Sequence, residues 1–329
     1  MAVLITGATG FIGSHVARKL KEKGERVRAL ARPSSKTEQL DAMGAEVVRG
    51  DITDRESVLK ALDGCDTLYH CAGFVSFKKR DYPKMVGINV DGARNALSAA
   101  LEAGVGKVVF TSSVAALGPA AEGELITEET EPDPSFSGAD IGYMKVKRAA
   151  EAAALDFCGK GLNVVITNPS VVVGEGDVHL SSVGSVLWYC KRRFPGYMDG
   201  TLNLTDAGDV AEGHILAAEK GRTGERYILS NTNLTVPEYF AMLEKVTGIP
   251  SPKVKIPYAA AYISAFLAER LPGFAFPNYS TMDLDSVKLS RYNWLADCSK
   301  AERELGYRRS SIEDSLARTV VWLKSRGLL

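Results

Sequence analysis

"TGATGFIG", residues 6–13, is the stretch that decides the fold of this chain. It directly follows the apolar run 2–5 and leads into segment 12–23, where Val16, Leu20 and several small residues share one helical face. A strand, a glycine-rich turn and a helix in this order form a cradle for a pyrophosphate, because glycines let the backbone turn tightly and the first helical amides face the anion. The alternative is a glycine-rich loop that only packs the helix closely on the strand.

The composition is that of an ordinary globular protein. The chain has 329 residues, 45% of them apolar and 24% charged, which suffices for one large domain or two modest ones. Lysine plus arginine and aspartate plus glutamate each number 40, so no net basicity favours a nucleic-acid partner.

Two stretches bear on targeting. The short apolar strand at the start has no basic region before it, and the longest apolar stretch, 256–271, is interrupted by Glu269 and Arg270. We therefore expect no signal peptide and no membrane span, a buried or lid helix over 256–271, and a cytoplasmic location. The five cysteines match no metal-ligand spacing and the four histidines are scattered, so we expect reduced thiols and no bound metal.

The first half alternates strand-like and helix-like segments. Apolar runs rich in valine, leucine and isoleucine are typical of strands buried on both faces of a parallel sheet. Their alternation with helical segments predicts an α/β fold, a doubly wound parallel (Rossmann) sheet with right-handed crossovers. The predicted strands are 2–6, 26–31, 46–49, 67–70, 107–112 and 163–168, and the predicted helices are 12–23, 55–62, 82–103 and 140–160.

After Pro169 the alternation of strand-like and helix-like segments becomes less regular. Later helical patterns fall at 209–220, 236–247, 258–271 and 312–326. They predict a smaller, mostly helical cap over the carboxyl ends of the strands, where ligands of such sheets bind. We expect a dinucleotide-binding domain over 1–175, to which 200–230 returns, and a substrate-binding cap over 176–329.

Tyr143 and Lys147 are candidate catalytic residues. They stand four positions apart in an alanine-rich helical segment and so share one helix face. A phenol is a poor base at neutral pH, and a neighbouring ammonium favours its ionised form, so the pair can transfer a proton. Lys145 and Arg148 are competing basic neighbours, and the alternative is a solvated lysine beside a packing tyrosine.

The glycines of residues 7–13 are spaced G-x-x-G-x-x-G, and with the wording TGATGFIG they resemble the extended short-chain dehydrogenase/reductase family. The stretch VVFTSSVAALG, 108–118, resembles the family's strand-end segment, in which a serine or threonine precedes a glycine by five residues. That rule selects Ser113, counted back from Gly118, as the third catalytic residue, with Ser112 and Thr111 as alternatives. The resemblance implies that Ser113 donates a hydrogen bond to the substrate oxygen beside Tyr143.

Further segments extend the resemblance from Met1 to about Ser230. The resemblance implies that Asp51 meets the adenine ring, that small residues after the fourth strand allow close approach of the cofactor, and that the loop after the sixth strand lies near the nicotinamide. Three more places resemble the family. Asn89 falls in the family's central-helix motif, and Asp209-Val210-Ala211 matches the family's late D-V-A element. Segment 301–307 resembles a carboxyl-terminal segment of the family. The expected cofactor-binding residues are Gly7, Thr9, Gly10, Phe11, Ile12, Gly13, Arg32, Lys36, Asp51, Ile52, Cys71, Ala72, Gly73, Asn89, Thr111, Tyr143, Lys147, Pro169, Ser170 and Val171.

The end of the second predicted strand favours NADP, with NAD as the second choice. NAD enzymes of this architecture place an acidic residue there to bind the ribose hydroxyls. This chain has Arg32 at that position and Lys36 shortly after it. A guanidinium suits a phosphate in geometry and charge, whereas ordinary surface basicity is the alternative.

The resemblance leaves several reactions open, since reductases, epimerases and dehydratases of the family share a hydride-transfer step. Dehydratases carry Asp-Glu after the strand-end hydroxyl, where this chain has Val114 and Ala115. Sugar-nucleotide epimerases carry an asparagine where this chain has Val171. The chain is most similar to bacterial dihydroflavonol 4-reductase-like and hopanoid-associated sugar epimerase-like proteins, so a carbonyl reductase is expected and an epimerase is the alternative. Non-catalytic NAD(P) sensors typically lack the catalytic tyrosine. This chain has Tyr143 at that position, which disfavours a sensor.

Aromatic residues in three candidate pocket segments, 74–80, 134–141 and 179–197, favour an apolar or aromatic small-molecule substrate, although each ring taken singly is as well explained by packing. A homodimer is the candidate assembly. The rings concerned are Phe74, Phe77, Phe136, Trp188, Tyr189 and Phe194.

Overall fold

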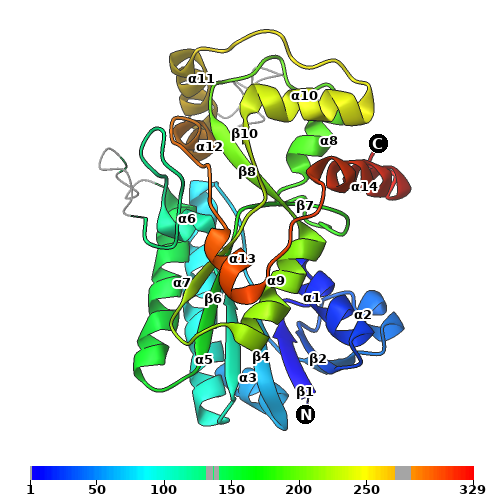
Figure 1. Cartoon of the computed structure of the whole chain (residues 1–329), viewed down its shortest axis with the longest axis vertical. Coiled ribbons are helices and arrows are strands. Elements are labelled where there is room, and N and C mark those ends of the chain that lie inside the picture. Colours follow the sequence, from blue (N-terminus) through cyan, green and yellow to red (C-terminus); the bar gives the residue numbers. More distant parts are fainter. Residues whose placement is uncertain (1, 131–135, 137–140, 271–282) are drawn as a thin grey trace.

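A seven-stranded sheet forms the centre of the molecule (Figure 1), and every neighbouring pair of its strands is parallel. The computed structural model describes residues 2–130, 136, 141–270 and 283–329. The strand order is β3-β2-β1-β4-β5-β6-β9, the order of a doubly wound sheet that starts at β1 and extends to both sides. The strands are β1 (Ala2–Thr6), β2 (Arg26–Ala31), β3 (Glu46–Arg49), β4 (Cys65–His70), β5 (Lys107–Thr111), β6 (Val164–Pro169) and β9 (Arg226–Leu229).

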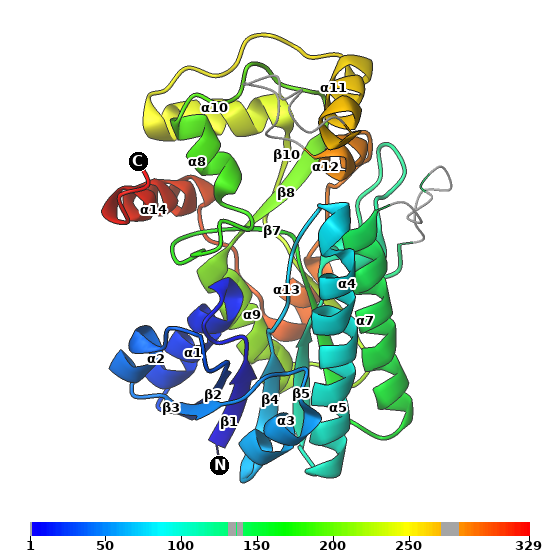
Figure 2. The same cartoon turned by 180° about the vertical axis from the view of Figure 1, so that it is seen from behind.

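Helices cover both faces of this sheet. One face packs against α1, α9 and α13, and the other packs against α3, α5 and α7, which stand together in Figure 2. Apart from the edge strand β3, the strands are largely buried on both faces, which explains their continuous apolar runs. The helices of these layers are α1 (Phe11–Glu22), α2 (Glu38–Ala42), α3 (Arg55–Leu62), α4 (Tyr82–Met85), α5 (Gly92–Glu102), α6 (Val114–Leu117), α7 (Gly142–Gly159), α9 (Ala207–Lys220) and α13 (Ser299–Leu305), with the 3₁₀ turn η1 (Lys79–Asp81).

The predicted doubly wound sheet is therefore confirmed, with element ends that differ by one or two residues. The helix expected over 82–103 contains a π-helical segment, η2 (Val86–Asp91), between α4 and α5. Segments of this kind often occur at functional sites. The predicted helix limits Asp140 and Leu271 lie outside the described residues.

A second, three-stranded sheet lies at the carboxyl ends of the main strands. Its order is β10-β8-β7, with β7 and β8 parallel and β8 and β10 antiparallel. The sequence analysis did not predict these strands, because they are short and only partly apolar. The cap consists of this sheet, β7 (Val171–Val173), β8 (Thr201–Asp206) and β10 (Thr232–Thr235), and of α8 (Gly184–Cys190), α10 (Val236–Thr247), α11 (Tyr258–Arg270), α12 (Leu284–Leu289) and α14 (Ile312–Ser325).

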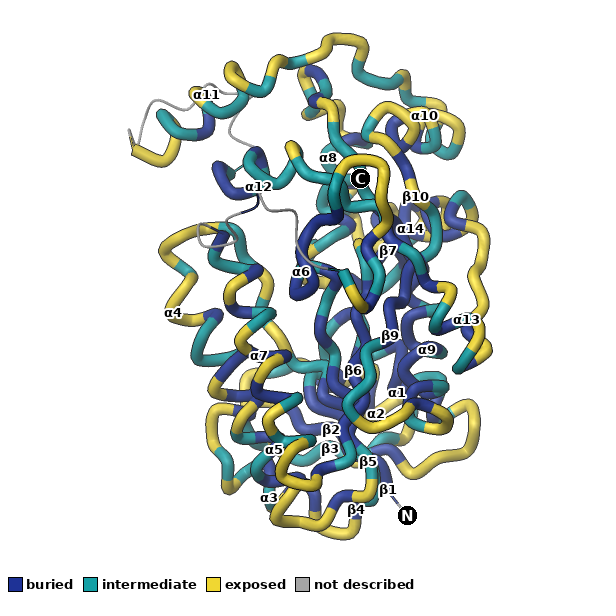
Figure 3. Tube along the Cα trace, turned by 60° about the vertical axis from the view of Figure 1, so that its left-hand side comes forward, coloured by how far each residue is buried: buried dark blue, intermediate teal, exposed yellow. Residues whose placement is uncertain are grey.

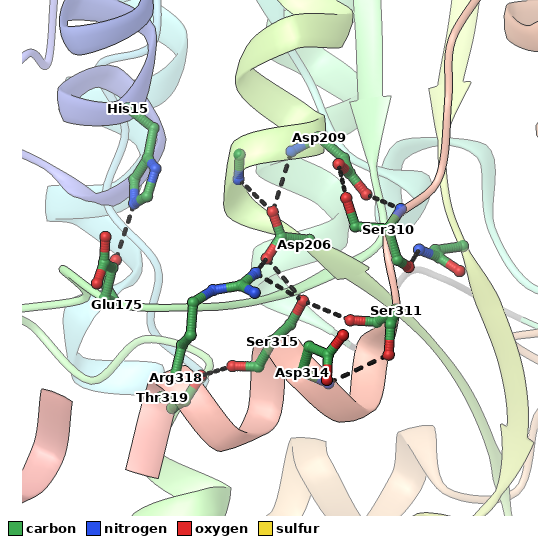
Figure 4. Close-up of polar contacts among 12 residues, drawn as sticks. His15, Glu175, Asp206, Asp209, Ser310, Ser311, Asp314, Ser315, Arg318 and Thr319 are labelled. Atoms are coloured by element: carbon green, nitrogen blue, oxygen red, sulfur yellow. Dashed lines mark hydrogen bonds and ion pairs between the residues drawn. The ribbon is translucent and has the colours of Figure 1, made fainter. Parts of the chain in front are cut away.

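Polar contacts fasten the last helix, α14, to the rest of the molecule (Figure 4). Asp206 at the end of β8 accepts two main-chain N–H groups from the first turn of α9, at 2.7 and 3.1 Å. Its other carboxylate oxygen accepts hydrogen bonds from Ser315 Oγ and Arg318 Nη2, both at 2.7 Å. Asp209 accepts from the main chain and the hydroxyl of Ser310, each at 2.6 Å. One strand end therefore anchors both the cap and the sheet-covering helix α9.

The loop after β7 is held against α1 in the same region (Figure 4). Arg18 Nη2 lies 2.9 Å from His15 Nδ1, so His15 Nε2 donates to the carbonyl of Glu175 at 2.8 Å. Burial lowers the pKa of His15, which keeps the ring neutral. Over the part of the chain that the structure describes, none of the helices has the length and apolar character needed to cross a bilayer.

Candidate active site

The glycine-rich turn between β1 and α1 has no room for side chains. Gly7 has a φ of 73°, in the left-handed region that favours glycine, and a Cβ there would lie 2.6 Å from the main-chain nitrogen of Ala72. A Cβ on Gly13 would lie 2.3 Å from the carbonyl oxygen of Gly7. Gly10 is the N-cap of α1 and donates to the Gly7 carbonyl at 2.9 Å. At its glycines the turn is therefore bare backbone that leads into the N-terminus of α1.

This cradle fits a pyrophosphate. The first turn of α1 contains no acidic side chain, and the positive end of the helix dipole lies at Phe11, directly after Thr9 and the N-cap Gly10. Ile12 follows Phe11 in that turn and is partly buried. The residues of the cradle would thus bind the diphosphate of a dinucleotide through main-chain amides rather than through side chains.

Arg32 and Lys36 are both exposed on the loop that follows β2. Within the described residues, no carboxylate pairs with the Arg32 guanidinium or the Lys36 ammonium. The loop itself is held by Arg49 of β3, whose guanidinium donates to the carbonyls of Arg32 (3.1 Å) and Ser35 (3.0 Å). Sequence reasoning missed Arg49, whose only signal was a cation at a strand end. The arrangement leaves the two predicted cations available for an added phosphate.

Asp51 and Ile52 follow β3 at the same edge. Asp51 Oδ1 accepts from the main chain and the hydroxyl of Thr53, both at 2.9 Å, so the carboxylate shapes its own turn. Ile52 is 9% exposed and packs against Gly92. A Cβ added to Gly92 would lie only 2.8 Å from Ile52 Cδ1. Both residues are fixed in position rather than free to rotate.

Asn89 shapes the segment after β4. Its amide oxygen accepts from the Phe74 main-chain N–H and its amide nitrogen donates to the Phe74 carbonyl, both at 2.8 Å. Both polar groups of the Asn89 side chain are used in these two hydrogen bonds. Asn89 also packs closely on Gly73, where an added Cβ would lie 3.0 Å from Asn89 Oδ1. Asn89 therefore positions the small residues Cys71, Ala72 and Gly73 beside the cradle.

Tyr143 and Lys147 lie on the first turns of α7, and Ser113 is the N-cap of α6 just after β5. Burial raises the pKa of Tyr143, while a hydrogen bond with the Ser113 side chain lowers it. Burial dominates, so the phenol is held protonated at neutral pH. This differs from the expectation that the Lys147 ammonium favours the phenolate, because desolvation disfavours the charged form.

Lys147 Nζ donates to the main-chain carbonyl of Thr111 at 3.1 Å. Burial lowers the pKa of Lys147 to about 8, although the carboxylate of Glu151 and the thiol of Cys71 raise it. The competing cations are placed differently: Lys145 is exposed, and Arg148 donates to the carbonyl of Ala116 at 3.0 Å.

A buried bridge joins the two elements that carry the candidate triad. Asn168 at the end of β6 donates to the Ser113 carbonyl at 3.1 Å and to Glu151 Oε2 at 2.8 Å. Glu151 is 3% exposed and pairs with Arg226 Nε at 2.6 Å. Sequence reasoning missed this bridge, although a carboxylate four residues after Lys147 was a readable signal.

Two neutral histidines lie behind the strand ends. His214 Nδ1 donates to the carbonyl of Val210 at 2.7 Å, so Nε2 accepts from the hydroxyls of Thr111 (2.9 Å) and Thr167 (3.0 Å). Burial lowers the pKa of His214 to about 4. His70 Nδ1 lies 2.9 Å from Thr6 Oγ1, and burial lowers its pKa to about 3. Neither ring carries charge at neutral pH, so Lys147 is the cation beside Tyr143.

The loop after β6 connects the site to the small sheet. Pro169 is buried at the strand end, and Ser170 Oγ donates to Asn203 Oδ1 at 2.6 Å. Val171 begins β7 and is 39% exposed. Position 171 therefore presents an exposed apolar side chain at the start of β7.

The candidate pocket aromatics separate into two groups. Phe77 contacts the Tyr143 ring edge-on at 5.5 Å between centroids, and Phe74 lies under the Lys84 ammonium. The second group packs elsewhere: Phe136 against Tyr292, Trp188 against Phe194, and Tyr189 against Phe240. The pocket segment expected over 134–141 lies largely outside the described residues.

Comparison with known proteins also indicates a family of dinucleotide-binding enzymes. The model of the "NAD dependent epimerase/dehydratase family" matches residues 3–230. The chain is 36% identical to "Putative dihydroflavonol 4-reductase" of Synechocystis sp. (98% of this chain, 94% of that one) and 34% identical to "Sterol demethylase protein B" of Methylococcus capsulatus (100% of both). The solved structure of gox2253 superposes with a TM-score of 0.87 at 35% identity, covering 100% of this chain and 99% of that one.

Fold and cradle together define a nucleotide-binding α/β enzyme. The chain belongs to the NAD-dependent epimerase/dehydratase family, the extended short-chain dehydrogenases/reductases, and is an NAD(P)-dependent oxidoreductase of that type.

Proposed function

We propose that this protein is an NADPH-dependent carbonyl reductase that converts an aldehyde or ketone of a small apolar or aromatic substrate to an alcohol. The observation that carries the proposal is the protonated Tyr143 phenol, hydrogen-bonded to Ser113 and one helical turn from Lys147. Reduction requires a proton donor at the substrate oxygen, and a buried neutral phenol is in that state at neutral pH.

Ser113, Tyr143 and Lys147 have separate roles in this reaction. When bound, NADPH would supply the hydride that the carbonyl carbon accepts, and the π electron pair would then move onto the oxygen. The Ser113 hydroxyl donates a hydrogen bond to that oxygen and fixes it beside Tyr143. Tyr143 then transfers its proton to the oxygen, and a solvent proton restores the phenol. Lys147 holds a positive charge beside the phenol, which stabilises the transient phenolate.

The choice of NADPH rests on Arg32 and Lys36. Among the residues that the structure describes, no carboxylate pairs with either cation. Both follow β2 and suit the 2′-phosphate, and position 32 carries no carboxylate to bind two ribose hydroxyls. The apolar substrate class is supported by Phe77 beside Tyr143, by the exposed apolar surface at Val171, and by a relative whose name refers to a sterol.

An epimerase remains the second candidate, since the family name includes that activity. Its substrate would be a sugar, whose hydroxyls need polar partners that Val171 and Phe77 do not offer. The deciding experiment incubates the protein and NADPH with a panel of aliphatic, aryl and cyclic carbonyl compounds and follows NADPH absorbance. Stoichiometric consumption with alcohol formation supports the reductase. A complete lack of consumption, with NADPH bound, overturns it and favours the epimerase or a non-catalytic sensor.

A further inference from the structure

The helix α11 is apolar around most of its circumference, although it lies at the surface of the cap. Residues 258–268 contain no charged side chain, and the charged residues of the helix are Glu269 and Arg270 at its end. Ala265 is its one buried residue among those that the structure describes. A surface helix of a globular protein normally presents charged and polar residues to water. The composition of α11 therefore implies a second apolar environment.

The inner face of α11 packs on the rest of the cap. Tyr262, Ala265 and Phe266 belong to a small apolar cluster that includes Leu284 and Val287 of α12. Packing within the cap therefore accounts for the apolar character of this face.

The outer face of α11 is exposed to solvent (Figure 3). Ala259, Ala260 and Ile263 are exposed, and the partly buried Leu267 follows on the same side of the helix. Ile263 is 58% exposed, and Val254, in the segment that leads into α11, is 63% exposed. An exposed group of apolar side chains of this kind marks a surface that contacts a protein or a membrane.

Cations border this outer face. Lys191, Arg192 and Arg193 are exposed and directly precede segment 194–198, which lines one cavity together with the inner face of α11. Lys253 is exposed in the segment before α11. Within the part of the chain that the structure describes, none of these four cations forms an ion pair with a carboxylate.

Carboxylates in the same region are already paired. Asp199 pairs with Lys255 at 2.7 Å, and Glu269 of α11 pairs with Lys79 at 3.3 Å. Ion pairing therefore leaves an excess of positive charge beside the apolar face, and an anionic surface complements it.

We propose that the outer face of α11, with the cations at 191–193 and Lys253, docks on the surface of an anionic phospholipid bilayer. The apolar face enters the headgroup region, while lysine and arginine contact the lipid phosphates. The chain lies on the membrane in this arrangement and does not span it. The inference concerns a partner of the cap and does not depend on the proposed reaction.

Two observations favour lipid over a protein partner. The most exposed side chains are alanine, isoleucine and valine, whereas the strongest contacts at protein interfaces come from tryptophan, tyrosine and arginine. A second copy of this chain is also disfavoured, because a two-fold interface through α11 would bring the same cations of both copies together.

Vesicle binding tests the proposal. The full-length protein is mixed with vesicles of equimolar phosphatidylcholine and phosphatidylglycerol, or of phosphatidylcholine alone, and the bound fraction is measured by flotation. Wild type should bind the anionic vesicles at least ~10-fold more tightly than the neutral ones, and added salt should weaken this binding.

Substitutions on α11 identify the surface that binds. Ile263→Glu places a charge on the apolar face and should weaken binding at least ~10-fold. Ile263→Trp adds a ring that prefers the headgroup region and should strengthen binding. Val321→Glu, at a position on α14 that is 67% exposed, is the matched control and should bind like wild type.

A double variant tests the cations. Lys191→Gln combined with Arg193→Gln should weaken binding to anionic vesicles at least ~10-fold. The control is Lys60→Gln combined with Lys145→Gln, which removes two exposed cations from α3 and α7 and should bind like wild type.

The outcomes that overturn the proposal are distinct from misfolding, because circular dichroism and NADPH affinity are measured for every variant and should match wild type. Absence of wild-type binding to anionic vesicles overturns it, as does equal binding by folded Ile263→Glu. A wild-type dimer that Ile263→Glu dissociates in sedimentation, without vesicle binding, would identify the face as an interface between copies and also overturn it. None of these readouts requires turnover, so failure of the reductase assignment leaves this inference standing.

Discussion

Lys147 and Thr111 are joined by a hydrogen bond in which Nζ donates to the main-chain carbonyl oxygen at 3.1 Å. Thr111 is the last residue of β5, and its hydroxyl lies 2.9 Å from Nε2 of the neutral His214. The strand end therefore fixes the ammonium in place from one side, while α7 carries it from the other. Tyr143, one helical turn earlier, takes its orientation from the same helix.

The phenol of Tyr143 is the first group to test. Tyr143→Phe keeps the ring packed against Phe77 and removes the proton carrier, so turnover should fall by ~100-fold or more while NADPH affinity changes little. Steady-state kinetics and cofactor titration measure the two quantities. Tyr82→Phe is the control, because that ring packs beside Gly142 and is 38% exposed. Retained turnover in Tyr143→Phe would remove this residue from the mechanism.

Lys147→Met should weaken both cofactor affinity and turnover, because the side chain would hold the nicotinamide ribose as well as stabilise the Tyr143 phenolate. Cofactor titration and steady-state kinetics measure the two effects. A loss of only one of the two would disprove the double role.

The same variant should be more stable than wild type at pH 7. The folded-state pKa of about 8 lies below the ordinary lysine value of 10.5, so the buried ammonium costs stability below pH 8 and the cost vanishes as pH approaches 10.5. The expected gain at pH 7 is on the order of 1–3 kcal/mol. Thermal unfolding of Lys147→Met and wild type at pH 7 and pH 10.5 checks the sign, and a stability gain that persists at pH 10.5 would contradict this account.

Glu151→Gln tests the bridge between β6 and α7. The Glu151 carboxylate raises the pKa of Lys147, so its removal should move the alkaline limb of the pH–rate profile from near 8 to lower pH. The amide oxygen can still accept the bond from Asn168, while the ion pair with Arg226 is lost. Lys145→Gln, on the exposed side of α7, is the control. An unshifted profile in Glu151→Gln would mean that the bridge only supports the fold.

Arg32→Ala should lower affinity for NADPH by roughly one to two orders of magnitude and leave NADH nearly unchanged, since charge-assisted contacts are worth about 1.5–3 kcal/mol. Titration with both cofactors measures the difference, and Lys60→Ala, an exposed cation on α3, controls for general loss of charge. Equal effects on the two cofactors would indicate a structural role for Arg32. A wild-type preference for NADH would refute the NADP assignment.

The sequence predicted those features whose cause is local. The glycines of residues 7–13 and the i, i+4 pair of Tyr143 and Lys147 each depend on one turn or one helix, and the doubly wound sheet follows from buried apolar runs. The features it did not predict join distant segments. Asn168 reaches Ser113 across 55 positions, and His214 reaches Thr111 across 103. Such contacts become visible only once the strand order is known.

The direction of hydride flow separates the two candidate functions. A reductase consumes NADPH stoichiometrically, whereas an epimerase oxidises and reduces the same bound cofactor within one cycle and leaves its absorbance unchanged. An epimerase must also let a keto intermediate turn over within the pocket, and the apolar surface at Val171 gives a sugar no polar group on which to pivot. The protonated state of Tyr143 likewise suits proton donation as the first use of the phenol. We therefore expect net NADPH loss with an aryl or cyclic carbonyl substrate, followed at a single wavelength with product analysis. Stereochemical inversion of a sugar without net NADPH loss would replace the reductase with the epimerase.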